Sequence, residues 1–306
     1  MWRIQRIWMG PRRWPTWPCL LHQRSSHMRL DVKKTYKLYI GGAFPRSESG
    51  RSYEVKDSRG NFIANPAQAS RKDLRDAVVA AKSASTGWQS ATAYNRGQIL
   101  YRIAEIMEGR ADQFVAEIAA LEGVSKASAL KQVHEAIDTW VWYAGWTDKI
   151  SSTAGSTNPI AGPYYNFTIP EALGVVGVVA DQKSSLLGLV RGIAPVLAGG
   201  NTAIVISSEK RPLPAITLSE CCATSDVPGG VLNILTGSTS ELTPWLASHM
   251  EIDGLDISGV DSKKDAEIRL AGTENLKRIH RFSAENSPHR ILSFMEYKTV
   301  WHPIGM

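Results

Sequence analysis

Cysteine is scarce in this chain of 306 residues, which contains only Cys19, Cys221 and Cys222. Three cysteines cannot build the disulfide framework that stabilises small secreted domains, so a reducing compartment fits best. The seven histidines do not pair with cysteines or acids at the spacing of metal ligands, which leaves a metal site without support. The longest apolar run, near residues 173–180, has the length of a strand and is too short for a membrane span. We therefore expect neither a membrane partner nor a bound metal.

Acidic residues are absent from the first thirty positions, which hold six arginines instead. The net charge of the chain is +6, so this segment accounts for all of it and gives no reason to expect a nucleic-acid partner. An Arg-rich, acid-free segment is typical of a mitochondrial presequence, whereas Pro11, Pro15 and Pro18 oppose the amphipathic helix of a presequence. We interpret residues 1–30 as a disordered leader or presequence, with a translated upstream stretch or an ordered arm as alternatives. The expected location is cytoplasmic, or mitochondrial if the segment is a presequence.

The next part of the chain is predicted to be mainly helical. Residues 37–44 have the pattern of two short strands around a Gly-Gly turn. Ser70 and Asp73 have the spacing of a capping box, which predicts a helix start. Apolar residues at helical spacing then predict successive helices, over residues 70–88, from residue 93 onward, and over residues 111–121 and 126–150.

Strands and helices alternate in the second half, with short connections. A polar connection over residues 151–163 leads to an alternating strand at residues 164–169. Apolar runs of strand length follow, at residues 174–179, 202–207, 231–235 and 254–257, and helical patterns separate them, at residues 186–197, 215–224 and 241–248. This alternation predicts an α/β fold with a doubly wound parallel sheet.

Several short motifs, namely KLYIGG, GVVGVVA, APVLAGGN, VPGGVLNILTG and ENLKR, follow one another over roughly residues 36–280. In this order they resemble successive landmarks of the aldehyde dehydrogenase superfamily, and FMEYKTV at residues 294–300 resembles the closing strand of that superfamily. The resemblance implies a domain of the N-terminal and cofactor-binding type over residues 31–280, with N-terminal helices, a Rossmann-type sheet and a protruding hairpin at residues 162–173. It implies a linker and a C-terminal oligomerisation strand over residues 281–306.

The ending KTVWHPIG is most similar to the degenerate C-terminal module of aldehyde dehydrogenase family 16, in which a catalytic-type module comes first. Between ENLKR and the closing strand the superfamily inserts a catalytic domain with a nucleophilic cysteine and a general-base glutamate. Here only about fifteen residues intervene. Because covalent hydride transfer needs a thiolate, the resemblance implies that the catalytic domain is missing and that there are no catalytic residues. Whether the chain is an enzyme is uncertain at this point.

Positions that would contact a cofactor are changed. The resemblance places Lys183 where active members have the asparagine that stabilises the oxyanion, and a solvated loop position is the better interpretation of this lysine. Ile206 stands where they have a lysine that bonds the ribose. Asp261 and Lys264 follow the turn below the pyrophosphate, where a carboxylate opposes anion binding. No cofactor is therefore expected.

Two positions of the cofactor site are retained. Glu209 and Gly259 match the ribose-binding glutamate and the first glycine of the turn, and we predict them as vestigial cofactor-binding residues. The alternative for Glu209 is an isolated surface carboxylate. If the residual crevice still binds NAD(P), the chain would be an NAD(P)-dependent aldehyde oxidoreductase or an NAD(P)-binding regulator.

Two adjacent cysteines, Cys221 and Cys222, are also candidate site residues. Cys221 and Cys222 lie on a predicted helix, where neighbours point about 100° apart, so one is expected to be buried and the other partly exposed, in a structural role. Redox sensing or nucleophilic catalysis is the alternative for them.

The hairpin and the closing strand are retained although the catalytic domain is missing. We therefore predict a pseudoenzyme module that forms a homo-oligomer or docks on a catalytic aldehyde dehydrogenase module.

Overall fold

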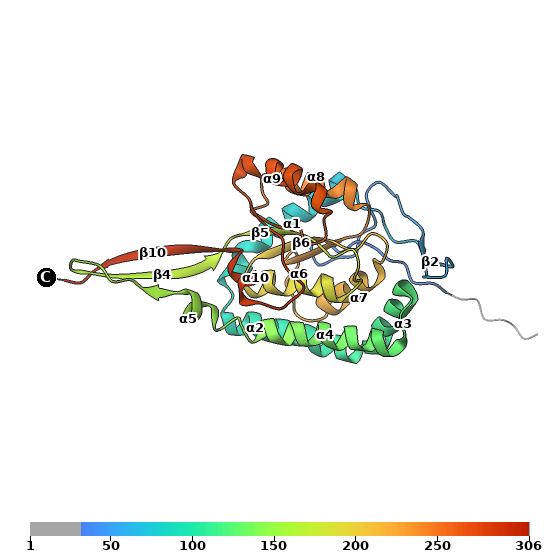
Figure 1. The fold of residues 1–306 in the computed structure, drawn as a ribbon, viewed down its shortest axis with the longest axis horizontal. Coiled ribbons are helices and arrows are strands. Elements are labelled where there is room, and N and C mark those ends of the chain that lie inside the picture. The colour runs from blue at the N-terminus through green and yellow to red at the C-terminus, as the bar shows by residue number, and fades with distance from the viewer. Residues whose placement is uncertain (1–31, 306) are drawn as a thin grey trace, which may run out of the picture. The chain divides into compact units, whose positions relative to one another are not determined.

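A computed structural model describes residues 32–305 of the chain. The chain divides into two units, Met1–Lys33 and Lys34–Met306, and the description below concerns the second unit (Figure 1). The predicted leader, residues 1–30, and Cys19 within it lie outside the described residues. Between residues 32 and 305, the helices are all too short or too polar to cross a membrane.

The N-terminal helices begin and end where the sequence provides caps. Ser70 accepts a hydrogen bond from the amide of Asp73, whose side chain bonds back to Ser70, so the predicted capping box is confirmed. Trp140 and Tyr143 are fully buried, so these aromatic residues pack the helices together. Five helices form this part: α1 (Arg71–Ser90), α2 (Ala93–Gly109), α3 (Ala111–Glu122), α4 (Lys126–Ala144) and α5 (Ile150–Ala154).

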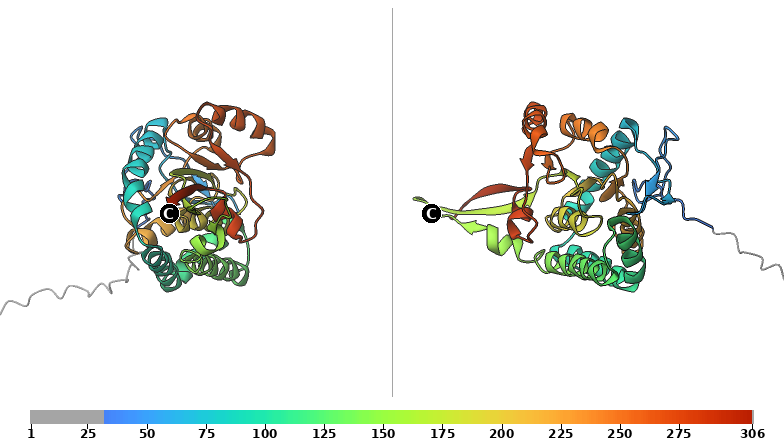
Figure 2. Two further views of the ribbon diagram at one scale, coloured as in Figure 1. Left: turned by 90° about the vertical axis from the view of Figure 1, so that its left-hand side faces the viewer. Right: turned by 45° about the vertical axis from the view of Figure 1, so that its right-hand side comes forward.

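The predicted parallel sheet is confirmed, with strand order β7-β6-β5-β8-β9. Alternate residues of the central strand enter different cores. Val176 and Val178 pack with the cluster that contains α2, α4 and α6, whereas Val175 and Val179 pack with α1 and α8. Helices therefore cover both faces of the sheet, as Figures 1 and 2 show. The strands are β5 (Val175–Val179), β6 (Thr202–Ile206), β7 (Leu232–Leu235), β8 (Gly254–Asp256) and β9 (Arg278–His280), and the helices between them are α6 (Leu187–Ala198), α7 (Leu213–Ala223), α8 (Thr239–Ser248) and α9 (Asp265–Ala271).

Two expectations about strands were wrong. Residues 37–44 do not form two strands, because they pair only through the single bridges Tyr39–Ile234 and Ile40–Ala43. The sheet gains a fifth strand, β9, which is too short to show an apolar pattern in the sequence. The remaining elements are short: β1 (Val55–Lys56), β2 (Phe62–Ala64), the 3-10 turns η1 (Ser262–Lys264) and η2 (Gly272–Asn275), and α10 (Pro288–Leu292).

A second, antiparallel sheet forms an arm that extends away from the rest of residues 34–305 (Figures 1 and 2). Its strands, in spatial order, are β10 (Met295–Pro303), β4 (Tyr164–Ala172) and β3 (Ser156–Thr157). Every residue of β10 has a partner on β4, from Met295 opposite Ala172 to Pro303 opposite Tyr164. The closing strand thus pairs along the whole of residues 164–169, and the pairing continues for three residues beyond them.

Candidate functional site: the cleft at the carboxyl ends of the sheet

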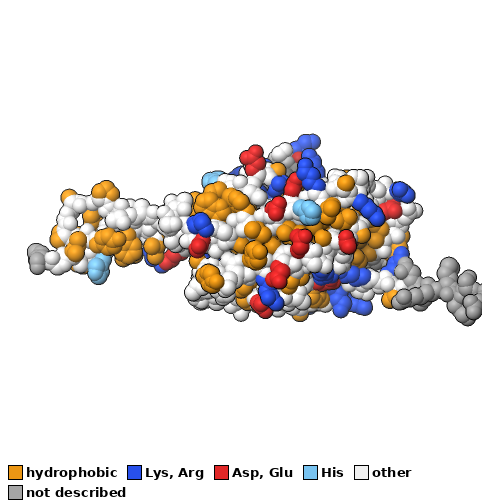
Figure 3. Space-filling model, turned by 90° about the horizontal axis from the view of Figure 1, so that it is seen from below, with side chains coloured by type: hydrophobic (Ala, Val, Ile, Leu, Met, Phe, Trp, Pro, Cys, Tyr) orange, Lys and Arg blue, Asp and Glu red, His pale blue; other side chains and the backbone are white. Residues whose placement is uncertain are grey.

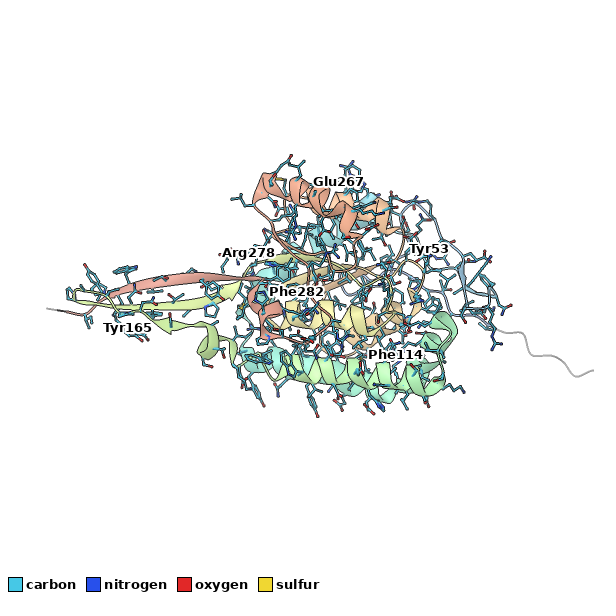
Figure 4. The ribbon with its side chains drawn as sticks, viewed as in Figure 1. Tyr53, Phe114, Tyr165, Glu267, Arg278 and Phe282 are labelled. Atoms are coloured by element: carbon cyan, nitrogen blue, oxygen red, sulfur yellow. The ribbon has the colours of Figure 1, made fainter. Side chains whose placement is uncertain are left out.

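The main cleft opens at the carboxyl ends of β5 and β8, where doubly wound sheets bind ligands. Its volume is about 750 Å³. The wall combines strand ends, the first turns of α6 and the segment that returns from β9, so it is built by parts of the chain that are far apart in sequence. Figure 4 labels Phe282, one of the lining residues, at the centre of the molecule.

A buried ion pair forms part of the cleft wall. Nη2 of Arg290 lies 3.2 Å from Oδ2 of Asp256, and the two side chains are only 5% and 3% exposed. Burial raises the pKa of Asp256, and Arg290 and hydrogen bonds from Ser258 oppose this shift. The Arg290 guanidinium also lies over the Phe282 ring, 4.9 Å from its centroid. The pair therefore fastens the α10 segment to the carboxyl end of β8.

Glu209 has a structural role that the sequence interpretation did not foresee. Its Oε2 accepts a hydrogen bond from the amide of Thr239 at 3.0 Å, and its own amide donates to Oε1 of Gln182 at 2.9 Å. Glu209 therefore caps the first turn of α8 and ties it to the loop after β5. The alternative of an isolated surface carboxylate was wrong, because the side chain is bonded to a helix start.

Gly259, the other predicted site residue, lies against the end of β5. A Cβ atom at this position would lie 1.8 Å from the carbonyl oxygen of Ala180, so only glycine fits. This close packing accounts for the glycine whether or not a ligand binds. Lys183 is exposed on the loop after β5, as predicted, and Ile206 is fully buried in the sheet.

A second cavity, of about 670 Å³, lies between α8 and α9 and adjoins the cleft through Gly259 and Val260. Its walls are mainly apolar, with Glu209 at one side. Oδ1 of Asp261 accepts a hydrogen bond from the amide of Lys263 at 3.1 Å. The carboxylate thus takes up the amide of Lys263, a donor that a phosphate at this turn would need. Its negative charge would also repel the phosphate. The residues present fit a pyrophosphate poorly, whereas the cavity itself is large enough for a small molecule.

The adjacent cysteines lie outside the cleft. Cys221 and Cys222 are both fully buried, so the expectation that one would be partly exposed was wrong. The helix α7 packs against other elements on most of its circumference, and neighbouring positions are therefore both covered. Burial raises the pKa of Cys221 to about 11 and that of Cys222 well above its ordinary value. Buried thiols of raised pKa are poor nucleophiles, which supports the structural role.

The sequence interpretation missed Asp256, Arg290 and Arg191, which the fold brings to the cleft. The one signal was a charged residue at the end of an apolar strand, at Asp256. No sequence pattern marked Arg290 as a site residue, because its partner Asp256 is 34 residues away. Among residues 32–305 no group of three or more His, Cys, Asp or Glu is placed to hold a metal ion.

Known proteins with this architecture are aldehyde dehydrogenases. The aldehyde dehydrogenase family matches residues 44–299. Retinal dehydrogenase 2 of Gallus gallus is 32% identical over 278 residues, which are 88% of this chain and 52% of that protein. Cytosolic 10-formyltetrahydrofolate dehydrogenase of Mus musculus is 32% identical over 85% of this chain and 29% of that protein. The chain thus spans about half the length of the first relative and less than a third of the second.

Solved structures agree with these relatives. The NAD+ complex of an aldehyde dehydrogenase from Bacillus cereus superposes with a TM-score of 0.76 at 25% identity, over 80% of this chain and 50% of that chain. HpcC from Thermus thermophilus gives a TM-score of 0.77 at 26% identity, over 81% of this chain and 48% of that chain. From the motifs, the doubly wound sheet and these matches together, the chain belongs to the aldehyde dehydrogenase family.

Proposed function

We propose that this chain is a non-catalytic module of the aldehyde dehydrogenase family that acts in assembly, as a dimer or docked on a catalytic aldehyde dehydrogenase. The observation that carries the proposal is the arm. In the described part of the chain, β10 pairs on one side only, so its other edge has unpaired backbone groups. A long unpaired edge that is also apolar is a template for pairing with another chain.

The side chains of the arm favour a protein partner. Large hydrophobic residues are exposed on both of its long strands, including Trp301, which is 60% exposed: they are Tyr164, Tyr165, Ile169, Tyr297 and Trp301. Figure 3 shows hydrophobic side chains along the arm on the face in view. Apolar residues gathered on an exposed strand pair mark an interaction surface. Strands of this length would otherwise promote aggregation.

The arm is built to keep its direction relative to the sheet. Asn201 accepts a hydrogen bond from the amide of Gly174 at 2.8 Å and donates one to the carbonyl oxygen of Phe294 at 2.9 Å. Arg278 forms an ion pair with Glu296 at 2.8 Å. Both strands of the arm are thus fastened at its base to the cofactor-type domain. Figure 4 labels Arg278 at that base and Tyr165 far out on the arm.

The cleft gives no support to a covalent dehydrogenase mechanism within the described residues. No cysteine lines it, and Cys221 and Cys222 are buried residues of α7, outside the cleft. Glu209 is engaged in capping α8. A nucleophile must reach the substrate and be activated by a base, and neither condition is met there.

The test compares variants of the arm by light scattering. Tyr297→Lys with Trp301→Lys places charges on the exposed face of β10 and should convert a dimer to a monomer that remains folded. Leu270→Lys, a substitution of an equally exposed residue on α9, is the matched control and should leave the mass unchanged. A mass that responds to neither change, both alone and with a catalytic aldehyde dehydrogenase present, would contradict the proposal. Wild-type mass that rises only when a catalytic aldehyde dehydrogenase is added would favour docking over self-assembly.

A second candidate is an NAD(P)-binding regulator. The cavity between α8 and α9 favours it, because Glu209 lies at the side of an apolar slot of about 670 Å³. The turn at Asp261 opposes NAD(P) binding, because the Asp261 carboxylate already accepts the hydrogen bond from the amide of Lys263. Calorimetric titration with NAD separates the two candidates, since the assembly module needs no cofactor.

A further inference from the structure

Arg191 is a cation without a partner in the wall of the cleft. It lies on α6, within the second turn, and its guanidinium forms none of the hydrogen bonds or ion pairs found among residues 32–305. Its Nε is buried and unbonded. A ligand in the cleft cannot reach this buried atom, whereas the two Nη atoms of Arg191 are neither buried nor bonded among residues 32–305, so the outer end of the guanidinium is free to pair with an anion.

Arg290 lies in the wall of the same cleft, but its guanidinium is already engaged. Its Nη1 donates to the carbonyl oxygen of Ser283 at 3.2 Å and its Nη2 to Asp256, but its Nε is buried without a partner. Burial raises the pKa of Tyr143, and the charges of Arg290 and Arg191 both oppose that rise, so both guanidinium groups lie near one phenol. Asp256 pairs with Arg290. Of these two arginines, Arg191 is therefore the one without an ion pair among residues 32–305.

We propose that the cleft binds a small monocarboxylate, whose carboxylate pairs with Arg191 while its apolar body contacts Leu187 and Phe282. The two Nη atoms at the outer end of the guanidinium can donate side by side to the two oxygens of a carboxylate. Both hydrophobic side chains line the same cleft, which at about 750 Å³ has the size of small-molecule sites.

The acidic residues of the cleft decide against a phosphate. Acids and bases are equal in number in its lining, which holds Glu122, Asp181, Asp256 and Asp261 against Lys183, Arg191, Arg281 and Arg290. A phosphate monoester carries nearly two negative charges at neutral pH, so it meets more repulsion from the acids than a carboxylate does. This assignment goes beyond the proposed role in assembly, because no residue of the arm strands β3, β4 and β10 lines the cleft.

The test is calorimetric titration of the full chain at constant ionic strength. The probes are benzoate, its neutral isostere benzamide, and inorganic phosphate. Benzoate should bind with a dissociation constant of about 1 mM, and benzamide and phosphate at least tenfold more weakly, since the charge-assisted pair is lost or opposed. Arg191→Gln should weaken benzoate at least tenfold, whereas Arg191→Lys, which keeps the charge without the planar fork, should lie between.

Arg59→Gln is the matched control, since Arg59 is exposed and does not line the cleft; benzoate binding should be unchanged in it. Thermal unfolding without ligand shows whether each variant is folded. The proposal is overturned by equal binding of benzoate and benzamide, by stronger binding of phosphate, by an unaffected Arg191→Gln variant, or by no benzoate binding at all. Because the readout is ligand binding, a failure here leaves the measured mass, and so the assembly proposal, untouched.

Discussion

The ion pair between Arg290 and Asp256 gives the sharpest prediction about stability. Arg290→Met removes the cation but keeps most of the side-chain volume, and leaves a carboxylate that is 3% exposed without its partner. Breaking a buried pair in this way costs about 3–5 kcal/mol, because the remaining charge is uncompensated. For a domain of this size the melting temperature should fall by about 10 °C.

The double variant Asp256→Leu with Arg290→Met is the control, since it removes both charges. It should recover most of the lost stability, because buried pairs can be replaced by apolar residues at little cost. The assay is thermal unfolding by circular dichroism, with urea unfolding as a second measurement. A loss below about 1 kcal/mol in the single variant, which is the range of an exposed pair, would refute the account of α10 as a segment fastened through this pair.

The pH dependence of the same variant has a defined sign. Burial already raises the pKa of Asp256 above its ordinary value of 3.8, and Arg290 limits that rise. Without Arg290 the pKa in the folded state rises further. A carboxyl group with a raised pKa stabilises the fold below its unfolded pKa and loses this contribution as the pH rises through the folded pKa. The deficit of Arg290→Met should therefore be smaller at pH 5 than at pH 8; an equal deficit at both would contradict this cause.

Three further predictions concern activity, the cysteines and the cofactor. The purified chain should form no NADH or NADPH from aldehydes above a heat-killed control, and robust turnover that disappears in Cys222→Ala would contradict the non-catalytic proposal. In a Cys19→Ser chain, a thiol reagent such as Ellman's should leave Cys221 and Cys222 unmodified until the protein unfolds, because both are buried; rapid labelling of the folded chain would show that α7 opens. NAD should bind with a dissociation constant above about 10 μM, since the turn at Asp261 is already capped, and tighter binding in calorimetry would favour the regulator.

The sequence predicted those parts of the fold that local patterns encode. Apolar periodicity indicated four strands of the sheet and its major helices, and Ser70 with Asp73 marked a helix start. It missed β9, whose three residues are too few to show a period. The sequence also predicted two strands over residues 37–44, where the structure has only single bridges. Short strands depend on their neighbours in space, and a single sequence does not display them.

The cleft was harder to predict than the fold. Glu209 and Gly259 were found by resemblance, but their contacts with Thr239 and Ala180 depend on how separate loops meet. The pair of Asp256 with Arg290 joins a strand end to a short helix, and no spacing in the sequence links them. The expectation that one of Cys221 and Cys222 would be partly exposed was wrong because α7 is covered on more than one side, which helical geometry alone does not reveal.

The central claim is that the free edge of β10 pairs with another chain. Hydrogen–deuterium exchange of residues 295–303, followed as the protein concentration is raised, tests it most directly. In an antiparallel pair, alternate amides of β10 point toward β4 and the others toward the free edge. The account predicts that the outward amides become protected as the concentration increases, while the inward ones are protected throughout. Outward amides that exchange freely at every concentration, in a chain whose mass stays at 33.6 kDa, would contradict self-assembly through this strand.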